Sequence, residues 1–544
     1  MKVCIIGGVA AGASCAARLR RLDENAEIII FERGAYISFA NCGLPYHISG
    51  VIENRDQLLL HTPDSFRERF NVEARVNHEV IKINRDNKTL TVRDLRASRE
   101  YSETYDKLLI STGARPFVPD IPGIDSEKVF FLKEINDMDS IISHIKERGA
   151  RTAAVIGGGF IGLEAAENLH EKGIAVHIIE AAPQVMAPLD SDLAFILHER
   201  IREAGISLRL SSELIEIKES VSGLDISLRD GGSVVCDFVI LSIGVRAENS
   251  LARDAGLSTG VSGAITVDET MATSDPDIYA AGDVIETLNI VTGEKAPVPL
   301  AGPANKQGRI AADNIAGRRA AYGGAQAAGI VKIFDLQAAS VGINSRRASF
   351  LGLDFDEVCL HPYNHASYYP GASSISMKVI FEKSAGRILG AQSVGSDGCD
   401  KRVDVISTAM RAGMTVYDLA DLDLCYAPPF GSAKDPVNMA GYIASNIRDS
   451  LAQFISWDRL SGIPDYLMLD VRNDEETSIL SFGDALHIPL HRLRDRIGEI
   501  PSGRKIVILC ASGVRSYIAA RILSQRGFRD LYVLSGGLMS KAGH

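Results

Sequence analysis

The sequence predicts an α/β protein of several domains, on two observations. An apolar strand, a glycine-rich turn and an alanine-rich helix follow one another twice, first from Val3 and again from Ala153. Near the C-terminus, another apolar strand ends at Cys510 and leads through a short loop into a helix. Alternating strands and helices are typical of parallel sheets covered by helices. At 544 residues the chain is too long for one hydrophobic core, so three or four domains are expected.

Composition and charge exclude several classes of function. The net charge of -11 and the sequence pI near 5.6 argue against binding of nucleic acid. The eight cysteines form neither a paired disulfide framework nor a CxxC metal pattern, so we expect no metal site and a reducing, cytoplasmic location. No apolar run reaches transmembrane length, and the glycines and arginines that follow Val3 argue against a signal peptide. We therefore expect a soluble protein without a membrane partner.

The first glycine turn predicts a dinucleotide site. The strand at residues 3–6 leads into GGVAAG at 7–12, where backbone amides can approach a pyrophosphate. Glu32 follows the next strand, at 27–31, and is placed to accept a hydrogen bond from a ribose hydroxyl. Val9 occupies the middle glycine position of the GxGxxG pattern, so a purely structural turn is the alternative interpretation.

The second glycine turn fits the pattern better. The strand at 153–156 leads into GGGFIG at 157–162, with all three glycine positions filled. A further strand, at 176–179, ends at Glu180, where the ribose-binding acid belongs. A carboxylate there would repel a 2′-phosphate, so the sequence favours NADH over NADPH. His177 is interpreted as a strand residue rather than a catalytic base.

The order of the motifs carries a family resemblance. STGA at 111–114 closes the first nucleotide unit, IGVR at 243–246 closes the second, and TSDPDIYAAGD at 273–283 contains a buried strand that ends in Gly-Asp. Together they resemble the flavoprotein disulfide reductases with two dinucleotide-binding domains, from residue 1 to about 448. The resemblance implies two Rossmann-like domains, one for FAD at 1–114 with 245–321 and one for NAD(H), with NADPH as the alternative, at 115–244.

The same resemblance implies which residues hold the two dinucleotides. They lie in the glycine turns, after the strands and at the start of a later helix. These cofactor-binding residues are Gly7, Gly8, Ala10, Ala11, Gly12, Glu32, Arg33, Asn41, Ser111, Thr112, Gly113, Gly157, Gly159, Phe160, Ile161, Gly162, Glu180, Gly244, Gly282, Asp283 and Ala301.

One cysteine is the candidate nucleophile. Cys42 lies in SFANCGLPY at 38–46, where Gly43 and Pro45 predict that it sits at the first turn of a helix. Unpaired amides and the helix dipole would favour its thiolate there, whereas a small buried hydrophobic residue is the alternative. Reductases of the glutathione type carry CxxxxC, but here His47 stands in place of a second thiol. Oxidised Cys42 must therefore be a sulfenic acid, a persulfide or a mixed disulfide.

The single-cysteine branch of this family contains NADH oxidases, NADH peroxidases and coenzyme A disulfide reductases. The oxidases and peroxidases usually carry a histidine in the first glycine turn, where this sequence has Ala10. Residues 322–448 resemble the family's α+β dimerisation domain, which implies a homodimer. Tyr368 and Tyr426 match tyrosines that coenzyme A disulfide reductases place in the partner's active site, although packing is the alternative. A phenol there can donate a proton to a departing sulfur.

An acidic protein needs a local site for an anion such as coenzyme A. The resemblance implies a groove for it that combines polar residues beside the cysteine with nearby cations. The residues are Ser14, Arg18, Arg21, Ser38, Asn41, Arg69 and Lys434. For the arginines of the first helix, a solvated helix face is the alternative.

The chain changes character after Asn446, and residues 455–544 resemble a rhodanese domain. One apolar strand ends at Asp470 and Arg472, and another ends at Cys510. The loop after Cys510 predicts amides aimed at a sulfur atom, with positive charge nearby. Four residues separate Cys510 from the loop arginine, one fewer than in related phosphatases, which suits sulfur better than phosphate; the loop consists of Ala511, Ser512, Gly513, Val514, Arg515 and Ser516. Little chain remains for a C-terminal helix, so this domain is a candidate for dependence on the main body.

These features favour a homodimeric FAD enzyme that uses NADH to reduce a coenzyme A disulfide, a coenzyme A persulfide or a polysulfide. Electrons would pass from NADH through the flavin to Cys42, whose thiolate attacks the S–S bond of the substrate. Cys510 would accept sulfane sulfur and pass it to a thiol such as coenzyme A. The alternatives are an NADH oxidase or peroxidase that cycles Cys42 as a sulfenic acid, and a redox-sensing sulfur carrier. The three substrates and the direction of sulfur flow stay open at this point.

Overall fold

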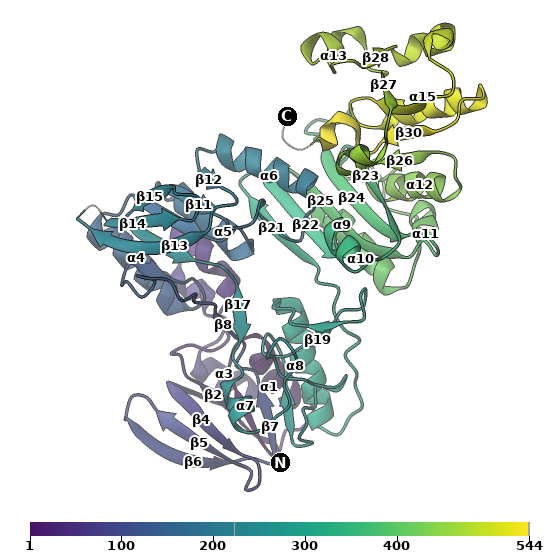
Figure 1. Ribbon diagram of the computed structural model, residues 1–544. Coiled ribbons are helices and arrows are strands. Elements are labelled where there is room, and N and C mark those ends of the chain that lie inside the picture. Colours follow the sequence, from purple (N-terminus) through teal and green to yellow (C-terminus); the bar gives the residue numbers. More distant parts are fainter. Residues whose placement is uncertain (222, 542–544) are drawn as a thin grey trace. The chain divides into compact units, whose positions relative to one another are not determined.

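The computed structural model describes residues 1–221 and 223–541, which form two compact units (Figure 1). The first unit comprises Met1–Val185 and Ala204–Ala327, and the second comprises Met186–Glu203 and Ala328–His544. The predicted boundary at residue 544 falls outside the described residues. Among the described helices, none combines the length and apolar character that a membrane span requires.

A five-stranded parallel sheet, in the order β18-β7-β1-β2-β3, forms the first half of the first unit. Ile5, Ile29 and Leu109 have no exposed surface because the sheet lies inside a core shared with helices. Helices α1 (Ala10–Arg20) and α8 (Ala301–Ile315) contact each other. The strands are β1 (Lys2–Ile6), β2 (Glu27–Glu32), β3 (Glu73–Val76), β7 (Lys107–Ile110) and β18 (Ile278–Ala280).

The second half of this unit repeats the first. Its parallel sheet has the order β12-β11-β10-β16-β9, with β9 (Val129–Phe130), β10 (Thr152–Ile156), β11 (Ala175–Ile179), β12 (Ser207–Arg209) and β16 (Phe238–Leu241). In each half the chain leaves the parallel sheet, after β3 or after β12, and forms a three-stranded antiparallel sheet. It then returns to the parallel sheet with β7 or with β16. The strands of the antiparallel sheets are β4 (His78–Asn84), β5 (Thr89–Asp94) and β6 (Arg99–Thr104), and then β13 (Leu214–Ser220), β14 (Gly223–Leu228) and β15 (Ser233–Cys236). The two strand–turn–helix segments predicted from the glycine turns therefore belong to two structurally repeated halves of the first unit.

The remaining elements of the first unit connect or cover these sheets. Strands β8 (Ala114–Pro116) and β17 (Val245–Ala247) pair antiparallel where the chain passes between the two halves. The other elements are α2 (Leu44–Ser49), α3 (Pro63–Phe70), α4 (Ile135–Arg148), α5 (Phe160–Glu171), α7 (Ser250–Asp254), β19 (Thr287–Leu288) and β20 (Lys295–Ala296).

The second unit contains an antiparallel sheet in the order β21-β22-β25-β24-β23. Helix α6 (Ser191–Glu203) contacts β25, and the buried Lys378 of β24 donates a 2.9 Å hydrogen bond to Asp192 of α6. The division of residues 115–244 as one domain stays a prediction, because α6 groups with this second unit. The elements are β21 (Gly329–Ile333), β22 (Leu336–Gly342), β23 (Phe355–Leu360), β24 (Ile375–Glu382), β25 (Ile388–Gly395), α9 (Ser345–Phe350), α10 (Cys399–Arg411), α11 (Val416–Asp421) and α12 (Pro436–Arg448).

The last part of the second unit is a five-stranded parallel sheet, ordered β26-β30-β29-β27-β28. The predicted α/β fold class is confirmed, with two repeated parallel sheets, an antiparallel α+β part and this smaller α/β part. Its elements are β26 (Gln453–Ile455), β27 (Tyr466–Asp470), β28 (Leu486–His487), β29 (Lys505–Leu509), β30 (Leu531–Leu534), α13 (Asp474–Ile479), α14 (Leu493–Arg496) and α15 (Val514–Gln525).

Candidate functional site

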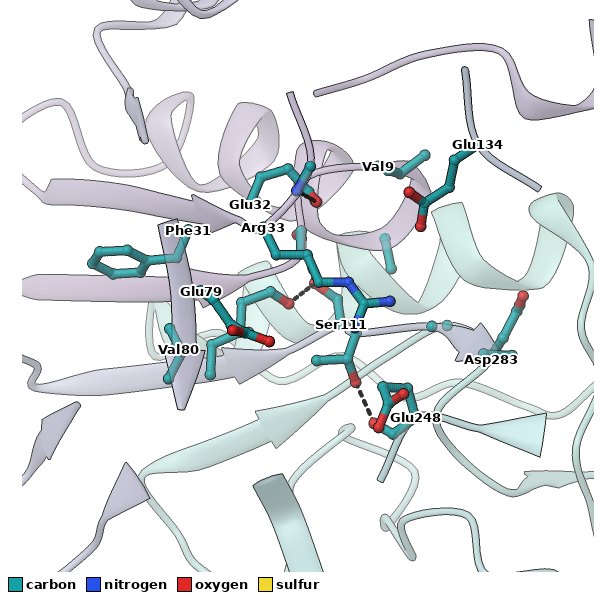
Figure 2. Close-up of a pocket in the computed structure, with 18 of the residues that line it drawn as sticks. Val9, Phe31, Glu32, Arg33, Glu79, Val80, Ser111, Glu134, Glu248 and Asp283 are labelled. Carbon is teal, nitrogen blue, oxygen red and sulfur yellow. Dashed lines mark hydrogen bonds between the residues drawn. The ribbon is translucent and has the colours of Figure 1, made fainter. Parts of the chain in front are cut away.

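A cavity of 740 Å³ lies at the carboxyl ends of the first parallel sheet (Figure 2). Residues that follow β1, β2, β7 and β18 line it, which is where open α/β sheets bind their ligands. Its volume falls in the range of small-molecule sites. The predicted cofactor residues that line it are Gly7, Ala10, Ala11, Glu32, Arg33, Asn41, Ser111, Thr112, Gly113, Gly282 and Asp283.

In the first glycine turn, the start of the helix lies very close to the end of the strand. Glu32 accepts hydrogen bonds from the amides of Gly8, at 2.9 Å, and Gly34, at 2.8 Å, and burial raises the pKa of its carboxyl group. A Cβ atom added at Gly12 would lie 1.9 Å from the carbonyl oxygen of Gly7, so helix and strand meet too closely for a side chain. The amide-lined turn and the fixed carboxylate therefore fit a dinucleotide, and Val9 in the middle position does not disturb this geometry.

The second glycine turn repeats the same contacts. Glu180 accepts from the amides of Gly158, at 2.6 Å, and Ala182, at 2.7 Å. A Cβ atom added at Gly162 would lie 2.0 Å from the carbonyl oxygen of Gly157. Gly159 precedes α5, which Phe160 and Ile161 begin, and Gly244 has a φ of 111°, in the region that favours glycine. The second dinucleotide prediction thus rests on a turn with the same construction as the first.

Cys42 lies in a second cavity, of 260 Å³, beside the first. The two cavities share Val9, Ala10, Phe39 and Asn41 as lining residues, so the cysteine adjoins the nucleotide cavity. The predicted residues that line the smaller cavity with Cys42 are Ser14, Ser38, Asn41 and Ala301.

The local structure around Cys42 differs from the prediction. Cys42 is exposed in a single 3₁₀ turn, Asn41–Gly43, that precedes the six-residue helix α2. Burial of the sulfur, followed by the charges of Glu164 and Asp283, raises the pKa of Cys42. The predicted stabilisation of its thiolate by a helix terminus is therefore wrong for this arrangement of the chain. Burial of the sulfur, and after it two carboxylates from distant parts of the sequence, outweigh a short helix.

Glu164 is itself unusual. It lies on α5, and the hydroxyl of Tyr46 on α2 donates to its carboxylate at 3.4 Å. Burial raises the pKa of Glu164 to about 7, so this carboxyl group changes charge near neutral pH. The part of the negative charge at Cys42 that comes from Glu164 therefore depends on pH.

In the second unit, the predicted tyrosines form a pair. The hydroxyl groups of Tyr368 and Tyr426 are 2.9 Å apart, and the two residues are 74% and 47% exposed. The buried guanidinium of Arg402 donates to the carbonyl oxygen of Asn364, at 2.7 Å, and to Asp435, at 3.0 Å. Arg402 thus joins the segment before Tyr368 to the segment after Tyr426. Two hydroxyls held together on an exposed surface fit contact with another molecule better than core packing.

Cys510 follows β29 and is fully buried. Its sulfur accepts hydrogen bonds from the amides of Gly513, at 3.1 Å, and Ser516, at 3.4 Å, so the predicted amides do point at the sulfur. Arg515, which supplies the predicted positive charge, forms two hydrogen bonds with Glu476, at 2.5 and 2.7 Å. The positive charge expected beside the sulfur is therefore compensated by a carboxylate.

Comparison with family models identifies the fold. Residues 1–308, more than half of the chain, match the model described as pyridine nucleotide-disulphide oxidoreductase. The chain belongs to this family. Residues 329–436 match the dimerisation domain of the pyridine nucleotide-disulphide oxidoreductases, and residues 457–541 match the rhodanese-like domain. Both resemblances predicted from the motifs are confirmed.

Individual relatives give the same result. Coenzyme A disulfide reductase of Staphylococcus haemolyticus is 34% identical over 447 residues, which are 82% of this chain and 100% of the relative. The crystal structure of reduced Bacillus anthracis CoADR-RHD is 45% identical, with a TM-score of 0.97, over 99% of this chain and 97% of that chain. An NAD-dependent persulfide reductase from A. fulgidus is 40% identical, with a TM-score of 0.94, over 99% of this chain and 100% of that chain.

Among the cations predicted for the coenzyme A groove, the three in the first unit do not line the cavity of Cys42. Arg18 forms an ion pair with Asp313 at 2.7 Å, and Arg21 is exposed at the end of α1. Arg69 lies over the ring of Phe70, with its guanidinium carbon 5.4 Å from the ring centroid. None of the three lines the 260 Å³ cavity, and Lys434 is an exposed residue of the second unit.

Several residues of the two cavities were not predicted from the sequence. Leu60 and Asn305 line the Cys42 cavity, and Asn305 accepts a short hydrogen bond from Ser14. Glu134 and Glu248 line the larger cavity, and the backbone carbonyl of Glu248 accepts from Thr112 at 2.7 Å. Asn305 could have been predicted as a lining residue, because it follows the predicted residue Ala301 by four positions and so lies on the same helix face. The two glutamates belong to no motif that the sequence offers.

The rhodanese-like part is bonded to the antiparallel sheet of the same unit. Ser535 accepts from the amide of Cys359 at 3.1 Å, and the hydroxyl of Ser540 lies 2.9 Å from Nε2 of His361 and 3.0 Å from the sulfur of Cys359. Burial lowers the pKa of His361 to about 4, so this ring is neutral at pH 7.

Over residues 1–221 and 223–541, no group of three or more His, Cys, Asp or Glu side chains is arranged to hold a metal ion.

Proposed function

We propose that this pyridine nucleotide-disulphide oxidoreductase uses FAD and NADH to reduce a coenzyme A disulfide or persulfide at Cys42, and handles sulfane sulfur at Cys510. The observation that carries the proposal is the adjacency of the two cavities. Cys42 and the polar residues Ser14 and Ser38 line one cavity, which shares Val9 and Asn41 with the nucleotide cavity. A thiol between a dinucleotide and a polar pocket is placed to pass electrons between them.

The chain's own residues have separable roles in this proposal. The first glycine turn, with Glu32 and Ser111, would hold FAD, and the second, with Glu180, would hold NADH. When bound, FAD would supply the means to take a hydride from NADH and to pass two electrons to sulfur. The fixed carboxylate of Glu180 opposes a 2′-phosphate and supports NADH over NADPH.

At Cys42 the chemistry is thiol–disulfide exchange. The thiolate attacks one sulfur of the coenzyme A disulfide, a Cys42–S–S–CoA bond forms, and the other coenzyme A leaves as a thiolate. Two electrons and one proton then restore the Cys42 thiolate and release the second coenzyme A thiol. With a persulfide substrate, the same number of electrons releases sulfide.

The tyrosine pair supports a homodimer as the working form. Tyr368 and Tyr426 are exposed and belong to the segment that matches a dimerisation domain. In the proposed dimer, the two hydroxyls would face the partner's Cys42 cavity and donate a proton to the departing sulfur. A catalytically competent monomer would contradict this role.

An anaerobic substrate panel tests the proposal. NADH oxidation and sulfide release are measured with coenzyme A disulfide, coenzyme A persulfide and polysulfide, and separately with oxygen and peroxide. We expect turnover with the sulfur substrates. Turnover with only oxygen or peroxide would favour an oxidase or peroxidase, and flavin reduction without turnover would favour a redox-sensing sulfur carrier. The relatives named above as coenzyme A disulfide and persulfide reductases support the sulfur substrates.

A further inference from the structure

The Cys510 loop offers amides to a sulfur but little net charge. Cys510 has no exposed surface, and the amides of Gly513 and Ser516 donate to its sulfur. These donors stabilise a thiolate or a persulfide of any origin. Which donor molecule reaches the sulfur must therefore depend on the charges and surfaces around the loop.

Arg515 is the cation within the Cys510 loop, and it forms an ion pair. Its two terminal nitrogens bond separately to the two carboxylate oxygens of Glu476 on α13, at 2.5 and 2.7 Å. This contact lowers the pKa of Glu476 to about 2, so the carboxylate stays charged at neutral pH. Guanidinium and carboxylate together carry no net charge. The hydrogen bond to Glu476 chiefly raises the pKa of Arg515, and the nearby Cys510 sulfur adds to this shift.

The cations that the structure describes beside α13 are paired with carboxylates. Arg472, which donates to the carbonyl oxygen of Leu480 at 2.7 Å after the end of α13, forms a buried ion pair with Asp470 at 2.6 Å. The first turn of α13 adds two exposed acids, Asp474, which pairs with Arg492 at 3.3 Å, and Glu475. Val514, which precedes Arg515 at the start of α15, is 58% exposed and presents an apolar surface. A small dianion meets paired cations, acids and an apolar side chain here.

We propose that the Arg515–Glu476 pair makes Cys510 selective for persulfides whose stem is uncharged next to the sulfur, and disfavours thiosulfate. The inference deepens the proposed function and rests on it in taking Cys510 as an acceptor of sulfane sulfur. A thiosulfate dianion beside the Cys510 thiolate meets a loop cation, Arg515, whose charge Glu476 already offsets, so the repulsion is poorly compensated. A pantetheine-type persulfide carries no such charge near its sulfur and can lie along Val514.

The transfer step balances without an added oxidant. The Cys510 thiolate attacks the outer sulfur of R–S–SH, the new Cys510–sulfur bond forms, and the bond between the two donor sulfurs breaks. The donor leaves as the thiolate R–S⁻, and the persulfide on Cys510 keeps the hydrogen of the transferred sulfur. Because the leaving group takes the electron pair, neither partner needs a further reductant.

Glu476→Gln tests the inference with little structural change. Glutamine retains an oxygen that can accept from the amide of Asn473, a 2.9 Å bond of the helix cap, but it loses the charge that engages Arg515. The full-length protein is mixed with thiosulfate or with pantetheine persulfide, quenched, and analysed by intact mass and peptide mapping for one added sulfur on Cys510. Wild type should load faster from pantetheine persulfide. Glu476→Gln should speed loading from thiosulfate by about tenfold and leave loading from the persulfide nearly unchanged.

Two controls separate the possible outcomes. Glu475→Gln removes the same charge from an exposed neighbour on α13 and should leave the donor preference as in wild type. In wild type, added salt should raise the thiosulfate rate relative to the persulfide rate, because it screens repulsion. Equal wild-type loading from both donors, or the same effect in the Glu475 and Glu476 variants, would overturn the inference alone. No loading from either donor, with coenzyme A disulfide reduction intact, would overturn the sulfur-accepting role of Cys510 as well.

Discussion

The two candidate reactive cysteines differ in exposure and in the groups that surround their sulfur atoms. Cys42 lies in an exposed 3₁₀ turn, and burial of its sulfur, followed by two nearby carboxylates, raises its pKa. Cys510 is buried at the end of a strand, and two backbone amides donate to its sulfur. At Cys510 two loop amides donate to the sulfur, whereas at Cys42 burial and two carboxylates outweigh the backbone hydrogen bond that favours the thiolate. Cys42 is thus suited to a step in which the adjoining cavity supplies electrons, and Cys510 to holding a sulfur atom.

Loss of the exposed cysteine should have the largest effect. Cys42→Ser is expected to lower coenzyme A disulfide reduction by about 10³-fold or more, because it removes the nucleophile. Reduction of the flavin by NADH, followed by absorbance without oxygen, should persist because hydride transfer does not use the thiol. Cys425→Ser alters another exposed cysteine and should be near wild type. Substantial disulfide reduction by Cys42→Ser would remove Cys42 from its role.

Loss of the buried cysteine should separate the two activities. Cys510→Ser is expected to abolish transfer of sulfane sulfur and to preserve reduction of coenzyme A disulfide, because that reduction is assigned to Cys42. Thiocyanate formation from a persulfide donor with cyanide as the sulfur acceptor, and NADH oxidation with coenzyme A disulfide, measure the two activities. If a folded, flavin-loaded Cys510→Ser protein lost both, Cys510 would belong to the reductive site.

The tyrosine hydroxyls sharpen the assignment of chemistry to Cys42. Tyr426→Phe should lower kcat more than it raises KM for coenzyme A disulfide, by at most ~10² to 10⁴-fold, the range of positioned proton donors. The variant keeps the ring and loses the 2.9 Å contact with Tyr368. Tyr442→Phe changes another exposed tyrosine of the second unit and serves as the control. Unchanged turnover would leave Tyr426 with a packing role.

The smallest expected effect concerns the pH dependence of Cys42. The Glu164 carboxyl group, with its pKa raised to about 7, is neutral at lower pH and charged at higher pH. Its charge raises the pKa of Cys42 only when it is ionised, so Glu164→Gln should speed alkylation of Cys42 by about two- to fivefold above pH 7 and little below. Iodoacetamide labelling with peptide mapping measures the rates. Glu171→Gln, at the exposed end of α5, is the control, and an equal gain at low pH would contradict this cause.

The sequence predicted most reliably what a contiguous motif encodes. Both glycine turns and the acids Glu32 and Glu180 form the same contacts, because strand, turn and helix are local in the chain. The loop amides at Cys510 are local for the same reason.

The sequence did not predict which carboxylates lie beside Cys42 and beside the arginines of the two candidate sites. Glu164 is one of the two carboxylates that oppose ionisation of Cys42, and Glu476 engages Arg515; neither lies in the same motif as the residue it affects. Arg18, placed in a coenzyme A groove by resemblance, is bound by Asp313 from another helix. Each partner is set by tertiary packing, which a spacing pattern does not contain.

The hydrogen bonds of Ser535 and Ser540 bear on whether the C-terminal module can be transplanted. A cut near residue 450 would remove the partner of the buried Cys359 amide and leave both serines of the excised piece without their present acceptors or donors. Each stranded buried polar group costs on the order of 1–3 kcal/mol. A graft onto another protein would therefore need a recipient strand that reproduces β23, or replacement of these serines by small apolar residues.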